Sequence, residues 1–352
     1  MRNWLARHQG GPIGVDIGAR CVKLVQFSAD RSRLLDAVRW ELPPEAETGD
    51  ALVRGRHIAQ ALQQAREGRR FRGSSAVLCL NHRQLFVQNL RLPRLDTANL
   101  ARQVEQEAAG RLPFPLEEAD YRFVEAAEIR QGESPMREVI LLACRRSMLQ
   151  EQLDAIEAGG LRPVSVDVEP AALLRSFIQQ QRREEDARQR CLLVHLGYSR
   201  TTVMIAEGDH LLFLKHIEAG GGQFDRAVAD KLQLDASEAS ALRRHNGDRR
   251  ADQQDPVVAR SVAEAVRPVL ERLSGEISMC MRYHSVTFRG HSLARVVLSG
   301  GEAGPELAQA LEQRLNAKCE LSDPFRGRAN IDLPGRRGQW DVAVGLALRL
   351  VA

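Results

Sequence analysis

The chain has 352 residues, of which 43% are hydrophobic and 5% aromatic, and its net charge is only +4. This length predicts two domains or one bilobal unit. No apolar run reaches the roughly 18 residues that a membrane span requires, and the six cysteines include no C-x-x-C pair. The composition therefore excludes a membrane-spanning chain, a zinc module and a disulfide scaffold, and it predicts a cytoplasmic protein with reduced cysteines.

The first half of the chain opens with a strand, a tight turn at Gly18 and a second strand, over residues 15–27. A strand at 34–42 and a helix at 49–64 follow. Residues 74–160 then show the patterns of strand, strand, helix, strand, strand and helix. This order predicts a small α+β module inserted in a larger α/β fold.

The second half repeats the opening pattern. Val194-His195-Leu196-Gly197 has the spacing of Val15-Asp16-Ile17-Gly18, and a strand resumes at Thr202. The repeat predicts an internal duplication. The remaining elements are expected as a strand at 211–217, a helix at 224–232, a polar stretch at 235–255 with short helices at best, a helix at 261–287, a strand at 294–298, and helices at 307–315 and 339–351.

These patterns divide the chain into three predicted units. The first lobe comprises residues 1–73 and 161–190, the inserted module residues 74–160, and the second lobe residues 191–352. The charge-rich stretch 179–190 is expected to link the two lobes.

Glycine turns are the most informative chemical feature of the chain. They follow expected strands at Gly18, Gly197, residues 220–222 and Gly300-Gly301. The N–H groups of such turns can face an anion, Lys23 can supply a point charge, and Asp16 can orient water around a divalent cation. Only four of the 50 basic residues are lysines, so Lys23 suggests a need for a compact ammonium. An ordinary β-hairpin shares the local pattern, but two such hairpins with a Gly-Gly turn suit a nucleotide.

The chain resembles the actin/Hsp70/sugar-kinase superfamily and, within it, the PilM family of type IV pilus assembly proteins, relatives of the division protein FtsA. Asp16-Ile17-Gly18 with Lys23 is similar to the first phosphate motif, residues 194–202 to the second, and residues 298–301 to the adenosine motif. Segments more specific to PilM are Glu107-Ala108-Ala109, residues 112–118, residues 166–175, Asp323-Pro324-Phe325 and residues 344–349. The resemblance implies a duplicated, actin-like (ribonuclease H-like) two-lobed α/β fold with a small inserted α+β module.

The resemblance also implies a site for ATP and Mg²⁺. The residues that it assigns to the cofactor are Asp16, Gly18, Lys23, Gly197, Thr201, Gly220, Gly221, Gly300 and Gly301, with Asp16 also serving the metal ion. No catalytic residue is assigned.

Several positions depart from the family pattern. His195 stands where the second phosphate motif usually has aspartate, and an imidazole cannot replace a carboxylate around Mg²⁺. Ala19 replaces a usual Ser or Thr, and Ser240 and Arg243 fall where a Glu and a Lys near the ribose are usual. The combination predicts a weak or vestigial ATP site and no efficient catalysis.

The function implied by the resemblance is that of a cytoplasmic scaffold in type IV pilus assembly. Such a protein captures the N-terminal tail of a PilN-type single-pass inner-membrane protein, in a groove between the first lobe and the inserted module. Other proteins of the pilus alignment complex are further expected partners, homo-oligomerisation stays open, and the chain would lie peripheral to the inner membrane through its partners.

Two other functions remain open. An active ATPase or small-molecule kinase of the same superfamily would need a catalytic aspartate and a polar substrate pocket, and neither can be placed. An FtsA-like filament protein would need a C-terminal amphipathic membrane anchor, whereas the sequence stops at Ala352 within its last expected helix. Nucleic acid is not an expected partner, because the arginine run 243–250 includes no aromatic residue to stack bases.

Overall fold

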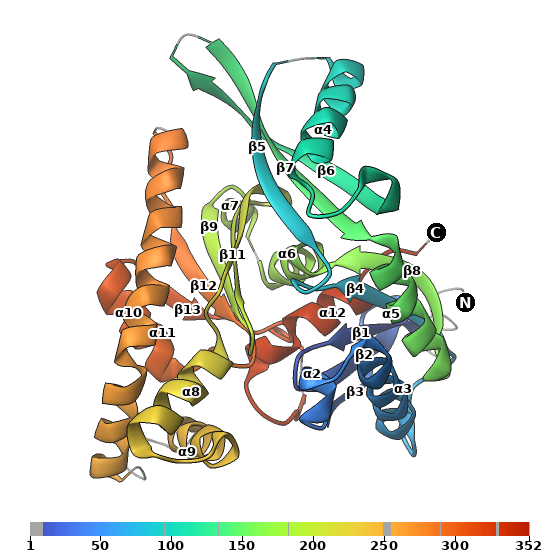
Figure 1. The fold of residues 1–352 in the computed structure, drawn as a ribbon, viewed down its shortest axis with the longest axis vertical. Coiled ribbons are helices and arrows are strands. Elements are labelled where there is room, and N and C mark those ends of the chain that lie inside the picture. The colour runs from blue at the N-terminus through green and yellow to red at the C-terminus, as the bar shows by residue number, and fades with distance from the viewer. Residues whose placement is uncertain are drawn as a thin grey trace.

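The computed structural model describes residues 10–94, 96–132, 134–181, 183–248, 255–288, 290–328 and 331–351. It contains two five-stranded sheets and a third sheet of three strands (Figure 1). In the first sheet the strand order is β3-β2-β1-β4-β8. Its strands are β1 (Gly10–Ile17), β2 (Cys21–Ser28), β3 (Leu34–Glu41), β4 (Ser75–Leu80) and β8 (Arg162–Val168).

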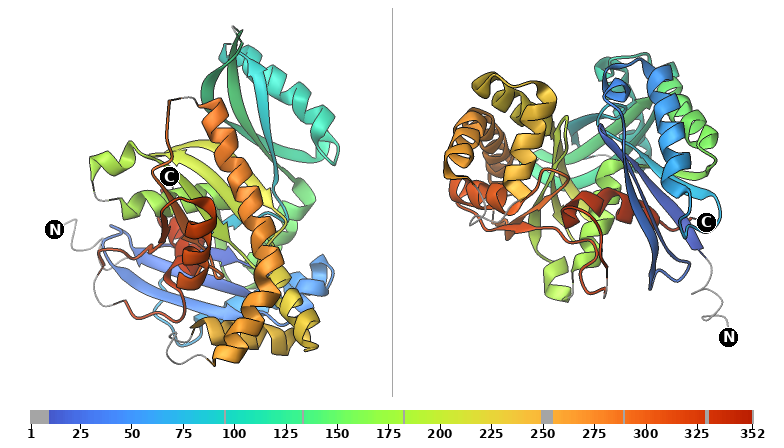
Figure 2. Two further views of the ribbon diagram at one scale, coloured as in Figure 1. Left: turned by 90° about the vertical axis from the view of Figure 1, so that its left-hand side faces the viewer. Right: turned by 90° about the horizontal axis from the view of Figure 1, so that it is seen from below.

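The second sheet repeats the topology of the first, with the order β11-β10-β9-β12-β13. Its strands are β9 (Arg190–Leu196), β10 (Thr201–Glu207), β11 (His210–Ile217), β12 (Arg295–Ser299) and β13 (Cys319–Leu321). β9 pairs antiparallel with β10 and parallel with β12, as β1 does with β2 and β4. The duplication expected from the sequence is therefore present strand by strand, and Figure 2 (right) shows the two lobes side by side.

Helices cover these sheets. Those in the first half of the chain are α2 (Glu45–Thr48), α3 (Ala51–Arg66), α4 (Thr97–Arg111), α5 (Arg146–Ala158), α6 (Glu169–Gln180) and α7 (Glu184–Ala187). Those in the second half are α8 (Gly221–Leu232), α9 (Ala236–Asp248), α10 (Pro256–Thr287), α11 (Pro305–Leu315) and α12 (Asp341–Ala347). No helix of the described ranges is both long and apolar enough to cross a lipid bilayer.

The central strands of the first sheet are buried on both faces. All eight residues of β2 are buried, as is usual for a strand with helices on either side. Leu24 packs with residues of α3, whereas Val25 and Phe27 pack with Trp340 and α12 on the other face. This burial fixes the ends of β1 and β2, and with them the turn at Gly18.

The third sheet has the order β5-β7-β6, with β5 at Phe86–Pro93, β6 at Ala119–Gln131 and β7 at Ser134–Arg145. One of its faces is covered by Leu100 and Val104 of α4. The other faces the second lobe, where Asn89 donates a hydrogen bond to the Leu214 carbonyl of β11 at 2.8 Å. Ile140 and Leu142 on the same face share a buried cluster with Cys79 of β4, so the inserted sheet rests on both lobes.

The structure differs from the expected inserted module in two elements. β4 lies between β1 and β8 in the first sheet, and α5 packs against α3. Both had been expected in the unit 74–160. A parallel strand pair such as β1 and β4 joins segments that are distant in the chain, so the local pattern cannot show it.

α12 also lies apart from its expected lobe. It packs against β1, β2 and α6 of the first lobe, although residues 191–352 were expected to form the second. The approach is close, because a Cβ atom at Gly14 or Gly345 would overlap the carbonyl of Ala343 or Ala172, respectively. The C-terminal part of the chain thereby connects the two lobes.

The polar stretch 235–255 was expected to hold short helices at best. In the structure its first part forms the 13-residue helix α9, and α10 begins at Pro256 rather than near residue 261. α9 buries Ala239 against Val228 and Val262. Only Leu242 of α9 joins it among the larger apolar side chains, so the helix gives little periodic signal in the sequence.

Candidate functional site

The glycine turns of the two lobes face a common cavity. The N–H of Gly18 donates to the Cys21 carbonyl at 2.9 Å, and the N–H of Gly197 donates to the Arg200 carbonyl at 3.0 Å. A cavity of about 120 Å³ lies between these turns. Of the residues assigned to a cofactor from the sequence, its lining includes Asp16, Gly18, Lys23, Gly197 and Gly301.

Asp16 and Lys23 form a buried ion pair at the floor of this cavity. Lys23 Nζ lies 2.7 Å from Asp16 Oδ2, and the side chains are only 11% and 12% exposed. Burial alone lowers the pKa of Lys23, but the attraction of Asp16 outweighs it and holds the pKa above its usual range. The lysine therefore stays charged and already has an anionic partner.

His195 lies on the opposite wall, at the end of β9. Burial lowers its pKa to about 4, so the imidazole is neutral near pH 7. Its Nδ1 is 2.9 Å from Ser299 Oγ on β12. A neutral ring supplies none of the negative charge that an aspartate would offer to Mg²⁺ and its water ligands.

Glu169 is a second carboxyl group in the cavity and was not among the expected site residues. It begins α6 directly after β8, and its Oε1 accepts a hydrogen bond from Thr202 Oγ1 at 2.8 Å. Burial raises the pKa of Glu169 to about 7, although the bond from Thr202 opposes the shift. Its only sequence signal was an acidic residue in the first turn of a helix, which usually reflects the helix dipole.

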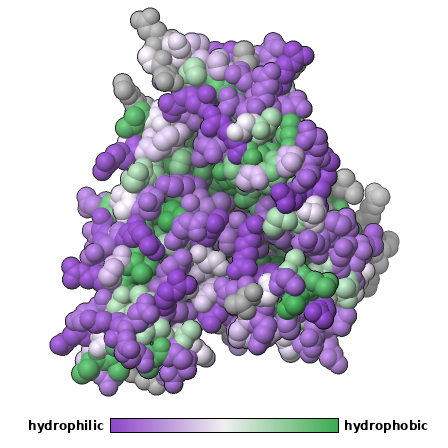
Figure 3. Space-filling view, viewed as in Figure 1, coloured by the Kyte–Doolittle hydropathy of each residue, from purple (hydrophilic) through white to green (hydrophobic). Residues whose placement is uncertain are grey.

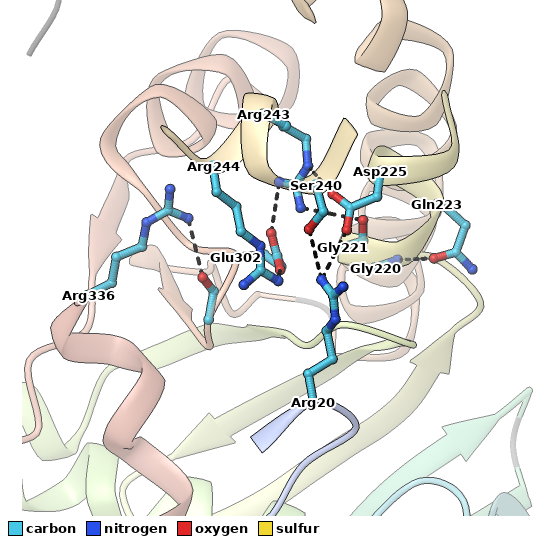
Figure 4. A network of polar contacts seen from close by, with 11 residues as sticks. Arg20, Gly220, Gly221, Gln223, Asp225, Ser240, Arg243, Arg244, Glu302 and Arg336 are labelled. Atoms are coloured by element: carbon cyan, nitrogen blue, oxygen red, sulfur yellow. Dashed lines mark hydrogen bonds and ion pairs between the residues drawn. The ribbon is translucent and has the colours of Figure 1, made fainter. Parts of the chain in front are cut away.

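Arg20 crosses the cleft from the first lobe to the second (Figure 4). Its Nη1 donates to Ser240 Oγ on α9 at 2.8 Å and lies 3.4 Å from Asp225 Oδ2 on α8. The guanidinium also lies over the ring of Tyr198, 4.4 Å from its centroid. Arg20, which was not among the expected site residues, thus ties the first glycine turn to the second lobe.

A network of charged groups fills the expected adenosine end of the cleft (Figure 4). Arg243 contacts Asp225 at 2.7 Å and Glu302 at 2.8 Å, and Arg244 contacts Glu302 at 3.0 Å. The carboxylates are each 4% exposed. Burial alone would raise the pKa of Glu302, but Arg243 and Arg244 keep it below its usual value, so Glu302 is charged. Arg243, on α9, is therefore held by ion pairs to α8 and to the segment after β12.

The other assigned residues do not line the cavity. The hydroxyl of Thr201 donates to the Ala219 carbonyl at 2.6 Å and is fully buried. A Cβ atom at Gly220 would come within 2.6 Å of the Gly197 carbonyl, and one at Gly221 would overlap Glu302. Gly300 has a φ of +94° and lies against the backbone of Leu196. These residues hold the turns in place.

The residues present fit ATP and Mg²⁺ only in part. The phosphate end offers glycine turns, Lys23 and the carboxyl groups of Asp16 and Glu169. The expected adenosine end is occupied by the buried Glu302 side chain, and the cavity of about 120 Å³ is below the roughly 300 Å³ at which ligand pockets begin. Within the described ranges, no cluster of three or more His, Cys, Asp or Glu side chains is arranged to hold a metal ion. A nucleotide would therefore have to open the cleft and displace side chains.

Comparison with known proteins agrees with this fold. The model of the family "Type IV pilus assembly protein PilM" matches residues 14–351. A solved "PilM-PilN type IV pilus biogenesis complex" contains a chain that superposes with a TM-score of 0.75 at 24% identity, covering 96% of this chain and 98% of that one. The ethanolamine utilization protein EutJ from Carboxydothermus hydrogenoformans superposes with a TM-score of 0.58 at 12% identity, covering 96% and 89%. The expected actin-like two-lobed fold is confirmed, and the chain belongs to the PilM family of type IV pilus assembly proteins.

Proposed function

We propose that this member of a pilus assembly family acts as a scaffold that captures the N-terminal tail of a PilN-type inner-membrane protein. The observation that carries the proposal is the superposition on the PilM-PilN complex, which extends over 96% of the chain and includes the inserted sheet. Binding to a PilN-type protein would place the scaffold at the cytoplasmic face of the inner membrane. Other pilus alignment proteins would be further partners there, and the scaffold would be able to self-associate.

The junction of the inserted sheet with the first lobe offers a surface for such a tail. β6 is an outer strand of its sheet, and α5 follows β7 directly at this junction. Leu112 and Tyr121 are half-buried on the α4 side of the inserted sheet. The half-buried Phe114 ring reaches the start of α5, since the guanidinium of Arg145 lies 5.3 Å from its centroid. Figure 3 shows hydrophobic side chains gathered below the inserted sheet. An extended tail can pair with an outer strand and place alternate side chains in apolar pockets.

A titration tests this proposal. Fluorescent peptides with the N-terminal sequences of PilN-type proteins would be titrated with the wild type and with Tyr121→Ala, and binding is expected to weaken at least about tenfold in the variant. Val257→Ala on α10 is the control, because Val257 is 71% exposed and belongs to a helix of the second lobe. Absence of peptide binding by the wild type, with and without nucleotide, would refute the scaffold proposal.

The cleft between the lobes would serve this scaffold as a weak nucleotide site. Proteins of this fold typically bind a nucleotide, and bound ATP with Mg²⁺ would supply charge that draws the two lobes together. Lys23 and the turns at Gly18 and Gly197 would hold phosphate oxygens, and Asp16 would orient the Mg²⁺ waters. Gly300-Gly301 would adjoin the adenosine after Glu302 moves. The lobe angle would then alter the tail site.

The strength of the nucleotide site can be measured with fluorescent ATP and Mg²⁺. We expect weak binding by the wild type and tighter binding by His195→Asp, which adds a carboxylate opposite Asp16. His210→Asp is the control, since the His210 side chain is 80% exposed on β11. Tight binding with turnover by the wild type would instead favour the active ATPase.

A further inference from the structure

A second concave surface lies at the far end of the inserted sheet. Its walls are the β6–β7 hairpin on one side and the C-terminal end of α10 on the other (Figure 1). The groove has a volume of about 1350 Å³. It shares no lining residue with the cleft between the lobes, and nothing in the proposed function uses it.

The groove is strongly basic. Among its lining residues, five are arginines and one is a carboxylate, Glu128. Arg91, Arg94 and Arg190 are paired with Glu138, Glu128 and Glu207, respectively. The other two, Arg130 and Arg282, are exposed and form no ion pair with another residue of the described ranges. The lining therefore carries positive charge that the described part of the molecule does not neutralise.

The groove also exposes apolar side chains between these charges. Met279 and Val286 are 58% and 64% exposed, among the most exposed large hydrophobic residues described. Arg282 lies three positions after Met279 and four before Val286, so the three side chains share one face of α10. Met136 of β7 lines the facing wall. A complementary ligand would combine negative charge with apolar side chains.

The shape and lining of the groove distinguish between anionic partners. A lipid surface is broad and flat, whereas the positive charges here line a recess between a hairpin and a helix. Single-stranded nucleic acid requires aromatic faces for its bases. Phe288 is only 6% exposed and its ring is covered by Arg190, 5.0 Å from the centroid. Tyr283, the other aromatic ring of the lining, is half-buried and packs against Phe213 with 4.8 Å between the ring centroids. A peptide segment fits the recess best.

We propose that this groove docks an acidic amphipathic segment of a partner protein. Glutamate or aspartate side chains of the segment would pair with Arg130 and Arg282, and its apolar side chains would cover Met279 and Val286. The scaffold would then hold two partners at once, one at each end of the inserted sheet. The proposal does not depend on capture of a PilN-type tail.

The test uses three fluorescein-labelled peptides of 16 residues in anisotropy titrations of the full chain. The first has Glu and Leu at helical spacing, the second has Lys for every Glu, and the third has Ser for every Leu. Only the first is expected to bind in a saturable manner, more weakly at high salt. The double variant Arg130→Glu/Arg282→Glu is expected to weaken its binding at least about tenfold.

Matched controls separate this proposal from its alternatives. Arg272→Glu reverses an exposed charge on the same helix outside the groove, and it should bind the first peptide as the wild type does. Equal binding of the Lys peptide, no binding of the Glu-Leu peptide, or an unchanged affinity in the double variant would overturn the proposal. So would sedimentation of the wild type, but not of the double variant, with phosphatidylglycerol vesicles, since that result would assign the groove to lipid. Tail peptides should bind the double variant normally, so failure here is distinct from failure of the scaffold proposal.

Discussion

Lys23 and Asp16 lie directly opposite each other on the β1–β2 ladder, and Lys23 Nζ donates to Asp16 Oδ2 at 2.7 Å. The residue expected to hold phosphate therefore neutralises the residue expected to serve Mg²⁺. A nucleotide would have to compete with this pair for both groups. The pair also stabilises the fold in the absence of a ligand, since each side chain is nearly buried.

The first prediction concerns this ion pair. Lys23→Met leaves the Asp16 carboxylate buried without a counter-charge, which costs about 3 to 5 kcal/mol of unfolding free energy. The double variant Asp16→Asn/Lys23→Met removes both charges and should recover most of that loss. Urea denaturation monitored by circular dichroism measures the difference. If the single and double variants unfold at the same urea concentration, the pair contributes no such stabilisation.

The second prediction concerns the contact between the lobes. Arg20→Ala removes the hydrogen bond to Ser240 and the ion pair with Asp225. We expect faster amide hydrogen exchange in α9 and in the turn at Gly18, and a loss of about 1 kcal/mol in unfolding free energy. Arg33→Ala, in an exposed position of the same lobe, is the control. Exchange that is unchanged in α9 would show that Arg20 does not hold the lobes together.

The sequence predicted the features that depend on residues close together in the chain. Alternating apolar residues around Gly18 and Gly197 identified both hairpins, and their matching spacing identified the duplication. Asp16 and Lys23 flank one of these turns, and the β1–β2 ladder pairs them directly. Such signals depend on residues a few positions apart, which is the range over which strand and turn preferences act.

The sequence did not predict contacts between distant segments. Arg20 and Ser240 are 220 positions apart, and Glu302 pairs with Arg244 over 58 positions. An acidic residue after Gly301 is ordinary in a polar loop, so nothing in the local sequence marks Glu302 as the partner of two arginines. The pairing of β4 with β1 was not predicted for the same reason, since the sequence of either strand alone does not show which strand it pairs with in parallel.

The third prediction concerns pH. Burial raises the pKa of Glu169 to about 7 from an ordinary value of 4.5. As the pH rises between these values, the unfolded chain loses this proton before the folded chain does, so the stability from protonated Glu169 is complete below pH 4.5 and lost as the pH passes 7. Glu169→Gln cannot ionise. Relative to the wild type it should gain on the order of 3 kcal/mol of unfolding free energy between pH 4 and pH 8.

Urea denaturation over this pH range checks the third prediction. Glu157→Gln is its control, because Glu157 is an exposed residue of α5 and should leave the pH dependence unchanged. A constant difference between Glu169→Gln and the wild type from pH 4 to pH 8 would mean that Glu169 titrates at its ordinary pKa.

The last prediction concerns the return of α12 to the first lobe. Gly345 lies so close to α6 that a Cβ atom would overlap the Ala172 carbonyl, and the overlapping atom belongs to the backbone, which cannot turn away. Gly345→Ala is therefore expected to cost about 3 kcal/mol of unfolding free energy, in spite of the better helix propensity of alanine. Gly275→Ala in α10 is the matched control, since a Cβ atom added at Gly275 would meet no atom within 4 Å outside its own helix backbone. That variant should gain roughly 0.5 to 1 kcal/mol. If both variants are stabilised in thermal denaturation, α12 does not pack against α6 as closely as described.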